Sequence, residues 1–358
     1  MSDHTVEAMN SRDVAQGIRW QSDHCMRNGS PATGRVLAAM LPLMSCDTQT
    51  GMRMVNWPGK PIEDAMPLRL AGGLHNLHLT GADDRLGPIY AGEVTDQAAV
   101  DAIVLAVVQA HDERLVEWFS GPPQTNEAGR SAGIMAQLLW LSARPELSNA
   151  TKFELNEVGA SAGINTMMDR FAFDLGGVRA GPASSPMLIK PEWRGPPPPQ
   201  GAVEITAIEG CDLAPMDLTD PALALRLKSY VWPDMPARLA RIDAAIALAR
   251  DKPPRVAKMD AADWVEQRLA TPQAPGVARV LFHSIVWQYL PPEGRARIEV
   301  AMAKAGAAAT RERPLAWVAV ETNRATFRHE LRVRFWPGGE EEVLLGQAHA
   351  HGVWVEWY

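Results

Sequence analysis

The sequence contains few cysteines, few tyrosines and no excess of positive charge, and it has no long hydrophobic run. Its 358 residues include only Cys25, Cys46 and Cys211, and this odd, widely spaced set indicates reduced thiols rather than a disulfide framework. The formal net charge of −7 argues against a nucleic-acid surface. No apolar stretch reaches the length of a membrane span, and the first residues are not typical of a signal peptide. We expect a cytoplasmic protein that acts on a small molecule, without nucleic-acid or membrane partners.

Two kinds of pattern divide the chain near residue 148. Residues 1–148 are predicted to be mostly helical, because apolar residues recur at helical spacing in stretches such as 100–108 and 134–139. From residue 149 onward, short apolar runs alternate with amphipathic stretches. The sequence therefore predicts an N-terminal helical domain at 1–148 that caps the active site of a second domain at 149–358. A glycine- and proline-rich insertion at about 171–203 interrupts the second domain.

The alternation in the second half predicts an α/β fold. Five runs are expected to form strands, and five amphipathic stretches to form helices between them. Such alternation is typical of a Rossmann-like, doubly wound and mostly parallel sheet, and the last thirty or so residues look like added antiparallel strands. The expected strands are 153–158, 203–208, 255–259, 277–282 and 315–320; the expected helices are 164–170, 221–230, 236–250, 261–269 and 293–305; the C-terminal strands are 329–336, 341–345 and 352–358.

The most informative motif follows the first of these strands. The strand leads through Glu157 into a turn in which Gly159, Ser161 and Gly163 alternate with small residues, and a helix is expected to follow. A strand that enters a helix through a small-residue loop brings the backbone close to a nucleotide-like ligand. We therefore expect a ligand at this loop.

Polar residues also follow the next three strands. Asp212, or alternatively Glu209, comes at the end of the second strand, Asp260 and Ala261 follow the third, and His283 ends the fourth. Ligands of open α/β sheets bind beyond the carboxyl ends of the strands. These residues are therefore expected to converge on one cleft.

These motifs resemble those of the class I S-adenosylmethionine-dependent methyltransferases. More closely, the chain resembles a bacterial family of uncharacterised proteins that carries such a domain. The methyltransferase likeness covers about residues 150–358, and the family likeness extends to the N-terminal helices. The resemblance as a whole rests on the segments Glu157-Val-Gly-Ala-Ser-Ala-Gly-Ile-Asn165, Gln124-Thr-Asn-Glu-Ala-Gly-Arg130, Val231-Trp-Pro-Asp234, Phe282-His-Ser284 and His351-Gly-Val-Trp354.

The resemblance implies S-adenosylmethionine as cofactor and assigns roles to the loop and the strand ends. Asp212 would hold the ribose, while Asp260 and Ala261 would face the adenine. Ser161 departs from the usual loop, which has glycine at that place. The residues expected to border the methionine part of the cofactor are Glu157, Gly159, Ala160, Ser161 and Gly163.

Methyl transfer to an oxygen or nitrogen atom of a small molecule is the expected reaction. It is an in-line displacement that depends on positioning, with a base where the nucleophile carries a proton. His283 is predicted to be this base, because the ordinary histidine pKa near 6.5 suits the task. Glu321, at the end of the fifth strand, is the second choice.

The segment 124–130 contains more hydrogen-bonding side chains than a helix cap needs. Thr125 or Asn126 could cap the helix that follows, and Glu127 is favourable in its first turn. We expect Asn126, Glu127 and Arg130 to contact the substrate from the helical domain.

Other interpretations remain open at this point. The order Gly159-x-Ser161-x-Gly163 is also that of a nucleophile elbow, in which Ser161 would attack an ester with Asp260 or Glu321 as orienting acid and His349 or His351 as base. A non-catalytic domain that binds a nucleotide-like ligand or a partner protein is the other alternative. The pairs His75/His78 and His349/His351 lack further ligands of recognisable spacing, so no metal site is predicted.

Overall fold

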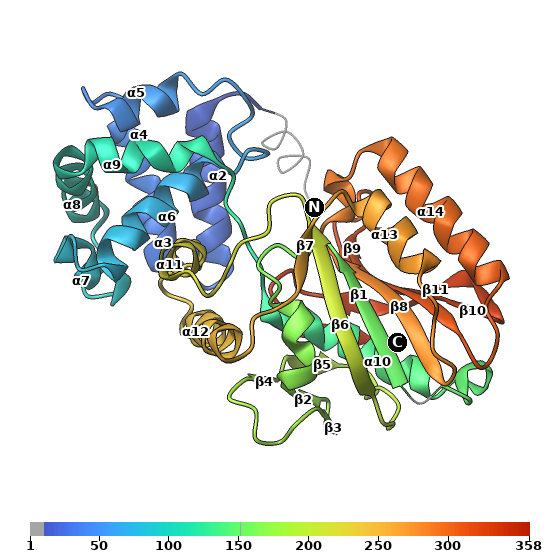
Figure 1. The fold of residues 1–358 in the computed structure, drawn as a ribbon. Helices are drawn as coiled ribbons and strands as arrows, with labels where there is room; N and C mark the ends of the chain where they lie inside the picture. Colours follow the sequence, from blue (N-terminus) through green and yellow to red (C-terminus); the bar gives the residue numbers. More distant parts are fainter. Residues whose placement is uncertain (1–10, 151) are drawn as a thin grey trace. The chain divides into compact units, whose positions relative to one another are not determined.

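The computed structural model describes residues 11–150 and 152–358, and these form two compact units. We call them the helical unit, which extends to Thr125 and includes Asp220–Asp243, and the sheet unit, which consists of Asn126–Thr219 and Ala244–Tyr358. Figure 1 shows the helices and strands of both. In the described part of the chain, no helix is both long and apolar enough to cross a membrane.

The helical unit packs short helices around a common apolar core. Ile18, Leu37 and Leu74 are fully buried in this core. Its elements are α2 (Val14–Arg27), α3 (Pro31–Ala38), α4 (Met40–Leu43), α5 (Gln49–Val55), α6 (Met66–Leu79), η1 (Asp84–Leu86), α7 (Gly87–Tyr90), α8 (Gln97–Ala110), α9 (Asp112–Val116), η2 (Glu117–Ser120), α11 (Pro221–Ser229) and the start of α12 (Pro236–Asp251).

The segment 220–243 belongs to the helical unit because its side chains complete that unit. Gly72 of α6 lies against the ring of Tyr230, where an added Cβ would come within 2.6 Å of Cδ1. Asp234 accepts hydrogen bonds from the backbone N–H of Ala32 (2.8 Å) and the hydroxyl of Thr33 (2.6 Å) at the start of α3. The sequence predicted one boundary at residue 148, and this prediction did not include a return of the chain to the helical unit at 220–243.

The sheet unit is an α/β structure around a nine-stranded sheet. The strand order is β5-β12-β11-β10-β9-β8-β1-β6-β7, and the run from β9 to β7 is parallel throughout. The strands are β1 (Lys152–Val158), β5 (Glu192–Arg194), β6 (Glu204–Asp212), β7 (Val256–Lys258), β8 (Val277–Ser284), β9 (Leu315–Thr322), β10 (His329–Trp336), β11 (Gly339–Ala348) and β12 (Trp354–Trp357); the helices are η3 (Ala128–Arg130), α10 (Ser131–Ser142), η4 (Pro145–Leu147), η5 (Asn165–Arg170), α13 (Ala261–Ala270), η6 (Trp287–Tyr289) and α14 (Pro292–Ala307).

The predicted order of strands and helices is confirmed, with two local differences. The helix expected at 164–170 is the 3-10 segment η5. A turn that contains residues with left-handed φ values precedes it. The insertion forms a small sheet of β2 (Ala172–Leu175), β3 (Val178–Ala180) and β4 (Leu188–Ile189). It also contributes β5, which extends the large sheet beside β12, where Trp193 packs on Trp357 with ring centroids 6.0 Å apart.

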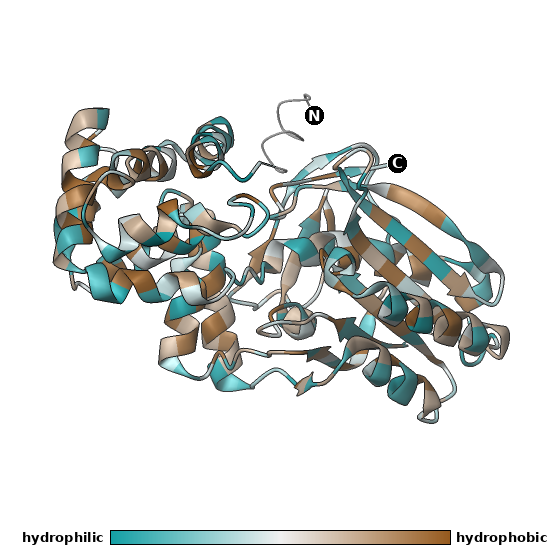
Figure 2. Cartoon of the chain, turned by 90° about the horizontal axis from the view of Figure 1, so that it is seen from above, coloured by the Kyte–Doolittle hydropathy of each residue, from teal (hydrophilic) through white to brown (hydrophobic). Residues whose placement is uncertain are grey.

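Helices cover both faces of the sheet around β9 and β10. On one face, Gly133 of α10 lies against Val320 and Leu331. On the other face, Gly306 of α14 lies against Trp336, and α13 packs beside α14 (Figure 1). Figure 2 shows hydrophobic residues along the strands of the sheet. Of the covering helices, α10 is strongly apolar, whereas α14 carries more hydrophilic residues.

Helix α10 corrects the predicted domain boundary. Its residues follow helical spacing, and on that ground they were expected in the helical domain. Ten of its 12 residues are buried, and its contacts are with β9 and β10. Helical periodicity does not specify the core against which a helix packs, so the boundary lies at residues 125/126 and not at 148/149.

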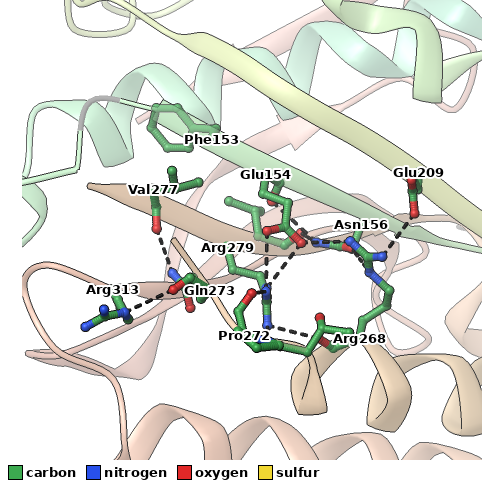
Figure 3. Close-up of polar contacts among 12 residues, drawn as sticks. Phe153, Glu154, Asn156, Glu209, Arg268, Pro272, Gln273, Val277, Arg279 and Arg313 are labelled. Atoms are coloured by element: carbon green, nitrogen blue, oxygen red, sulfur yellow. Dashed lines mark hydrogen bonds and ion pairs between the residues drawn. The ribbon is translucent and has the colours of Figure 1, made fainter. Parts of the chain in front are cut away.

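A network of charged side chains joins β1 to α13 and β8 (Figure 3). The carboxylate of Glu154 accepts from Arg268 (2.9 Å) and forms an ion pair with Arg279 (3.2 Å), which is only 4% exposed. Arg268 also donates to Asn156 (2.8 Å) and Glu209 (3.0 Å). Because burying a charge without a partner is costly, this network fixes the C-terminal end of α13 on the sheet.

Replacing Glu154 should therefore destabilise the sheet unit. In Glu154→Gln, Arg279 stays buried without a carboxylate, and we expect a loss of about 3 kcal/mol in the free energy of unfolding. Urea unfolding measures this loss. The matched control is Glu204→Gln, which removes an exposed ion pair of 3.5 Å with Lys152 at the start of the neighbouring strands; it should change stability by less than about 0.5 kcal/mol. Equal effects of the two changes would contradict the assigned role of the network.

Candidate functional site

The candidate site lies where the strand order of the sheet reverses. From β1 the chain passes to β6 and β7 on one side, and it then returns to β8 on the other side of β1. The carboxyl ends of β1 and β8 therefore flank the point at which α/β sheets bind ligands. Glu157 and His283 stand at these two ends.

The small-residue turn predicted after the first strand is present after β1, and its backbone is left-handed at three positions. Gly159, Ser161 and Gly163 have φ values of 70°, 53° and 73°. Glycine adopts this region at no steric cost, whereas Ser161 adopts it as a non-glycine residue. At Gly159 the space is also needed, because an added Cβ would lie 2.3 Å from Cγ2 of Val286.

Polar groups already fix the shape of this loop. The N–H of Ser161 donates to Asp212 Oδ2 (2.9 Å), and the N–H of Ile164 donates to Asn126 Oδ1 (2.7 Å). The other oxygen of Asp212 accepts from the N–H of Ala214 (2.9 Å), and Ala160 donates its N–H to the carbonyl of Cys211 (2.9 Å). Asp212 and Asn126 therefore hold the loop in place, and each carboxylate oxygen of Asp212 retains a second lone pair for a ligand.

Glu157 is a buried carboxyl with too few hydrogen bonds. It is 1% exposed, and Oε1 accepts from Asn165 Nδ2 at 3.4 Å. Among the described residues, its Oε2 and the Oδ1 of Asn165 have no hydrogen-bond partner. Burial raises the pKa of Glu157 to about 8, against the lowering effects of Asn165 and Arg130. Two polar atoms without a partner are thus left at the end of β1, and Oε2 of Glu157 is an acceptor when the carboxyl ionises.

His283 and Glu321 form a dyad at the ends of β8 and β9. Nε2 of His283 accepts from the indole N–H of Trp317 (2.9 Å), so Nδ1 carries the proton and donates to Glu321 Oε1 (2.7 Å). The same Oε1 accepts from the N–H groups of Val286 (3.0 Å) and Trp287 (3.2 Å). Both ring nitrogens of His283 are engaged, so this arrangement favours a positioning role over the predicted role as general base.

The pKa of Glu321 responds in the opposite direction to that of Glu157. Burial alone would raise it, but the hydrogen bonds that Oε1 accepts from His283 and from two backbone N–H groups outweigh burial and lower it. Glu321 is therefore a fixed negative charge at the end of β9, next to the hydrogen-bonded side chains of His283 and Trp317.

Asp260 caps a helix at the end of β7. Its Oδ1 accepts from the N–H groups of Ala262 (2.8 Å) and Asp263 (3.3 Å), which leaves Oδ2 for other contacts. Ala261 opens the same helix, α13, and is 8% exposed. Glu157, Asp212 and Asp260 lie at or just beyond the carboxyl ends of three neighbouring parallel strands, β1, β6 and β7, as the sequence predicted. The carboxyl ends of parallel strands meet at one edge of a sheet, so the three residues share that edge.

Glu127 and Arg130 lie in the sheet unit and not in the helical domain from which they were expected to act. Glu127 accepts from the N–H of Gly129 (3.1 Å) at the start of η3. Arg130 is 8% exposed, and it donates to the carbonyls of Ala350 (2.9 Å) and Ser284 (3.4 Å). Arg130 thus ties the end of β8 to the turn before β12.

Histidines gather around this turn without forming a metal site. The rings of His349 and His351 are 5.6 Å apart, and Nδ1 of His349 accepts from the N–H of His351 (3.1 Å). Burial and the charge of Arg130 lower the pKa of His329 to about 4. Across residues 11–150 and 152–358, no three His, Cys, Asp or Glu side chains are placed to hold one metal ion.

Sequence reasoning missed Asn165, Trp317 and Trp287. Asn165 had a signal, because the loop after Glu157 reverses the chain and returns a side chain eight positions later to the strand end. Trp317 is 34 positions from His283, and only the pairing of β8 with β9 brings the two together. Trp287 stacks on His283 with centroids 5.0 Å apart, through a turn that has no sequence signature of its own.

Comparison with known proteins places the chain in one family. The family model described as "Uncharacterized protein conserved in bacteria (DUF2332)" matches residues 15–357, and the chain belongs to this family. No curated protein matches the sequence. No solved structure matches it either.

The raised pKa of Glu157 predicts how stability depends on pH. The carboxyl ionises above about pH 4.5 in the unfolded chain but keeps its proton to about pH 8 when folded. Stability is therefore lost as the pH rises through this window. Relative to wild type, Glu157→Gln should gain a few kcal/mol, on the order of 3, between pH 5 and pH 8.

Chemical unfolding at a series of pH values checks this expectation. Glu204→Gln, in which an exposed carboxyl is replaced, serves as control and should follow the wild-type curve. Parallel curves for wild type and Glu157→Gln would show that the folded and unfolded pKa values do not differ.

Proposed function

We propose that the sheet unit is a Rossmann-like domain of the class I methyltransferase type. In this proposal it binds S-adenosylmethionine beyond β1, β6 and β7 and transfers the methyl group to an oxygen or nitrogen of a small molecule. The observation that carries the proposal is the strand order β7-β6-β1-β8-β9, with a left-handed small-residue loop after β1 and carboxylates after β1, β6 and β7. This is the arrangement in which α/β sheets hold adenosine-like ligands.

The polar groups left over at these strand ends suit such a cofactor. The ammonium of the methionine part would favour the ionised form of Glu157, and its buried Oε2 and the Oδ1 of Asn165 would then accept from that ammonium. Asp212 has lone pairs for ribose hydroxyls, and Oδ2 of Asp260 suits an adenine amino group. The bound cofactor supplies an activated methyl group on sulfur.

The residues of the chain contribute mainly position and charge to this reaction. His283 is held by Trp317 and orients Glu321, and the lowered pKa of Glu321 makes it a counter-charge rather than a strong base. Methyl transfer needs in-line geometry more than proton transfer, so fixed groups of this kind are adequate.

Calorimetry with S-adenosylmethionine and S-adenosylhomocysteine tests the cofactor site. Asp260→Asn keeps the helix cap, because asparagine caps as well as aspartate, but it replaces the acceptor Oδ2 by a donor. We expect about tenfold weaker binding. Asp220→Asn is the matched control: Asp220 caps α11 with the same two-bond geometry in the helical unit, and its replacement should change nothing.

The outcomes separate the alternatives. If wild type gives no heat with either compound, the cofactor proposal is wrong. If it binds both but releases no S-adenosylhomocysteine with any acceptor, the non-catalytic ligand-binding alternative is favoured.

One observation favours the hydrolase alternative enough to test it. Ser161 has the positive φ that a nucleophile elbow requires. A generic ester assay with Ser161→Ala and Ser161→Gly decides the matter, because glycine accepts this backbone and separates the loss of a hydroxyl from strain. Hydrolysis abolished by both substitutions would establish the serine as nucleophile.

A further inference from the structure

The sheet unit contains a pocket apart from the loop after β1. It has a volume of about 460 Å³ and lies on the face of β9, β10 and β11 that α14 covers in part. Trp317, Ala319 and Glu321 reach it from β9, and Trp287 closes it at η6. The turn at Val286 lies between this pocket and Gly159.

The charge of the pocket is negative. Four glutamates and two arginines line it, and His283 is neutral in the tautomer that its two partners require. Arg332 pairs with Glu330 and Glu342. Arg334 lies over the rings of Trp336 (5.1 Å to the centroid) and Trp317 (5.9 Å). Both cations are therefore already engaged.

Glu321 is the one carboxylate of the lining that is both largely buried and without a Lys or Arg partner among the described residues. Its side chain is 15% exposed, and the hydrogen bonds from His283, Val286 and Trp287 all reach Oε1. Its Oε2 therefore remains for whatever enters the pocket. A partly buried anion in this setting is stabilised by a cationic ligand.

Aromatic rings surround this carboxylate. Trp287 and Trp317 meet at 66° with centroids 5.4 Å apart, and His283 stacks on Trp287. Ring faces of tryptophan bind cations best when water is excluded. Arg334 already lies over Trp317, which is 8% exposed, so Trp287 is the ring of the lining that a ligand cation can use.

Few acceptors remain beside the aromatic rings, because Glu299, the other carboxylate of the lining without an ion pair among the described residues, is exposed to solvent. A primary ammonium presents three N–H donors and needs three acceptors. Here Asn323 Oδ1 already accepts from Ala325 and Thr326, and Glu330 Oε1 accepts from Asn323. An alkylated ammonium needs only a counter-charge and ring faces. A metal ion is disfavoured, since the described residues contain no cluster of three ligands.

We propose that this pocket binds a small quaternary ammonium ion, with Glu321 as counter-charge and Trp287 as ring contact. The site does not depend on the cofactor proposal, because the ion binds without S-adenosylmethionine. The two ideas can therefore fail separately.

Choline is the probe, and 3,3-dimethylbutan-1-ol, its uncharged carbon analogue, is the ligand control. Calorimetry on the full chain without cofactor should detect choline and should show binding of the alcohol at least about tenfold weaker. No binding of choline, or equal binding of the two compounds, overturns the proposal.

Three variants locate the charge. Glu321→Gln keeps an oxygen for the N–H groups of Val286 and Trp287 and should weaken choline binding about tenfold. Glu342→Gln removes the same formal charge from the lining, but from a carboxylate already paired with Arg332, and should change affinity less than about threefold. Trp287→Leu keeps apolar contact without the ring and should also weaken binding about tenfold.

A thermal unfolding midpoint for each variant identifies those that fold as wild type, and only these enter the comparison. If Glu321→Gln unfolds, Trp287→Leu still tests the site. Choline affinity that is unchanged in every folded variant among Glu321→Gln and Trp287→Leu, or that falls equally in Glu342→Gln, contradicts the assignment.

Discussion

The number of N–H donors at each strand end determines the chemistry of the sheet unit. Glu157 and Glu321 are both buried carboxyls at the ends of parallel strands. Glu157 receives one hydrogen bond, at 3.4 Å, whereas Oε1 of Glu321 receives three, at 2.7 to 3.2 Å. Burial raises the pKa of Glu157 to about 8, and the three donors reverse its effect on Glu321. Environments that separate two pKa values in this way give each acid a different role.

The strands of the sheet were predictable because they are short, largely apolar runs that alternate with amphipathic stretches. All five parallel strands and the C-terminal antiparallel strands occur where the pattern indicated, and β10 has the bounds 329–336 that the sequence suggested. Buried parallel strands are nearly continuous apolar runs, so their signal is strong. Glu154 and Arg279 did not hide this signal, because each stands between apolar residues; in the structure they form an ion pair beneath α13.

The parts that could not be predicted depend on partners that are distant in the sequence. Which core α10 packs against, and why 220–243 leaves the sheet unit, are decided by contacts such as Gly133 with Leu331 and Gly72 with Tyr230. The positions of the polar residues at the strand ends were predicted, but the contacts of their side chains were not. His283 was chosen for its ordinary pKa, yet its two nitrogens are engaged by Trp317 and Glu321, which only strand pairing brings near.

The turn at 285–287 connects the loop after β1 with the pocket beside β9. Ile285 has a φ of 53°, a strained value for a β-branched residue, which costs on the order of 1–3 kcal/mol. Glu321 offsets this strain, because it accepts the N–H groups of the next two residues, and Gly159 leaves room for Val286. A ligand that binds Glu321 therefore acts on the same turn that packs against Gly159. The loop after β1 and the pocket beside β9 are thus connected through the turn at 285–287.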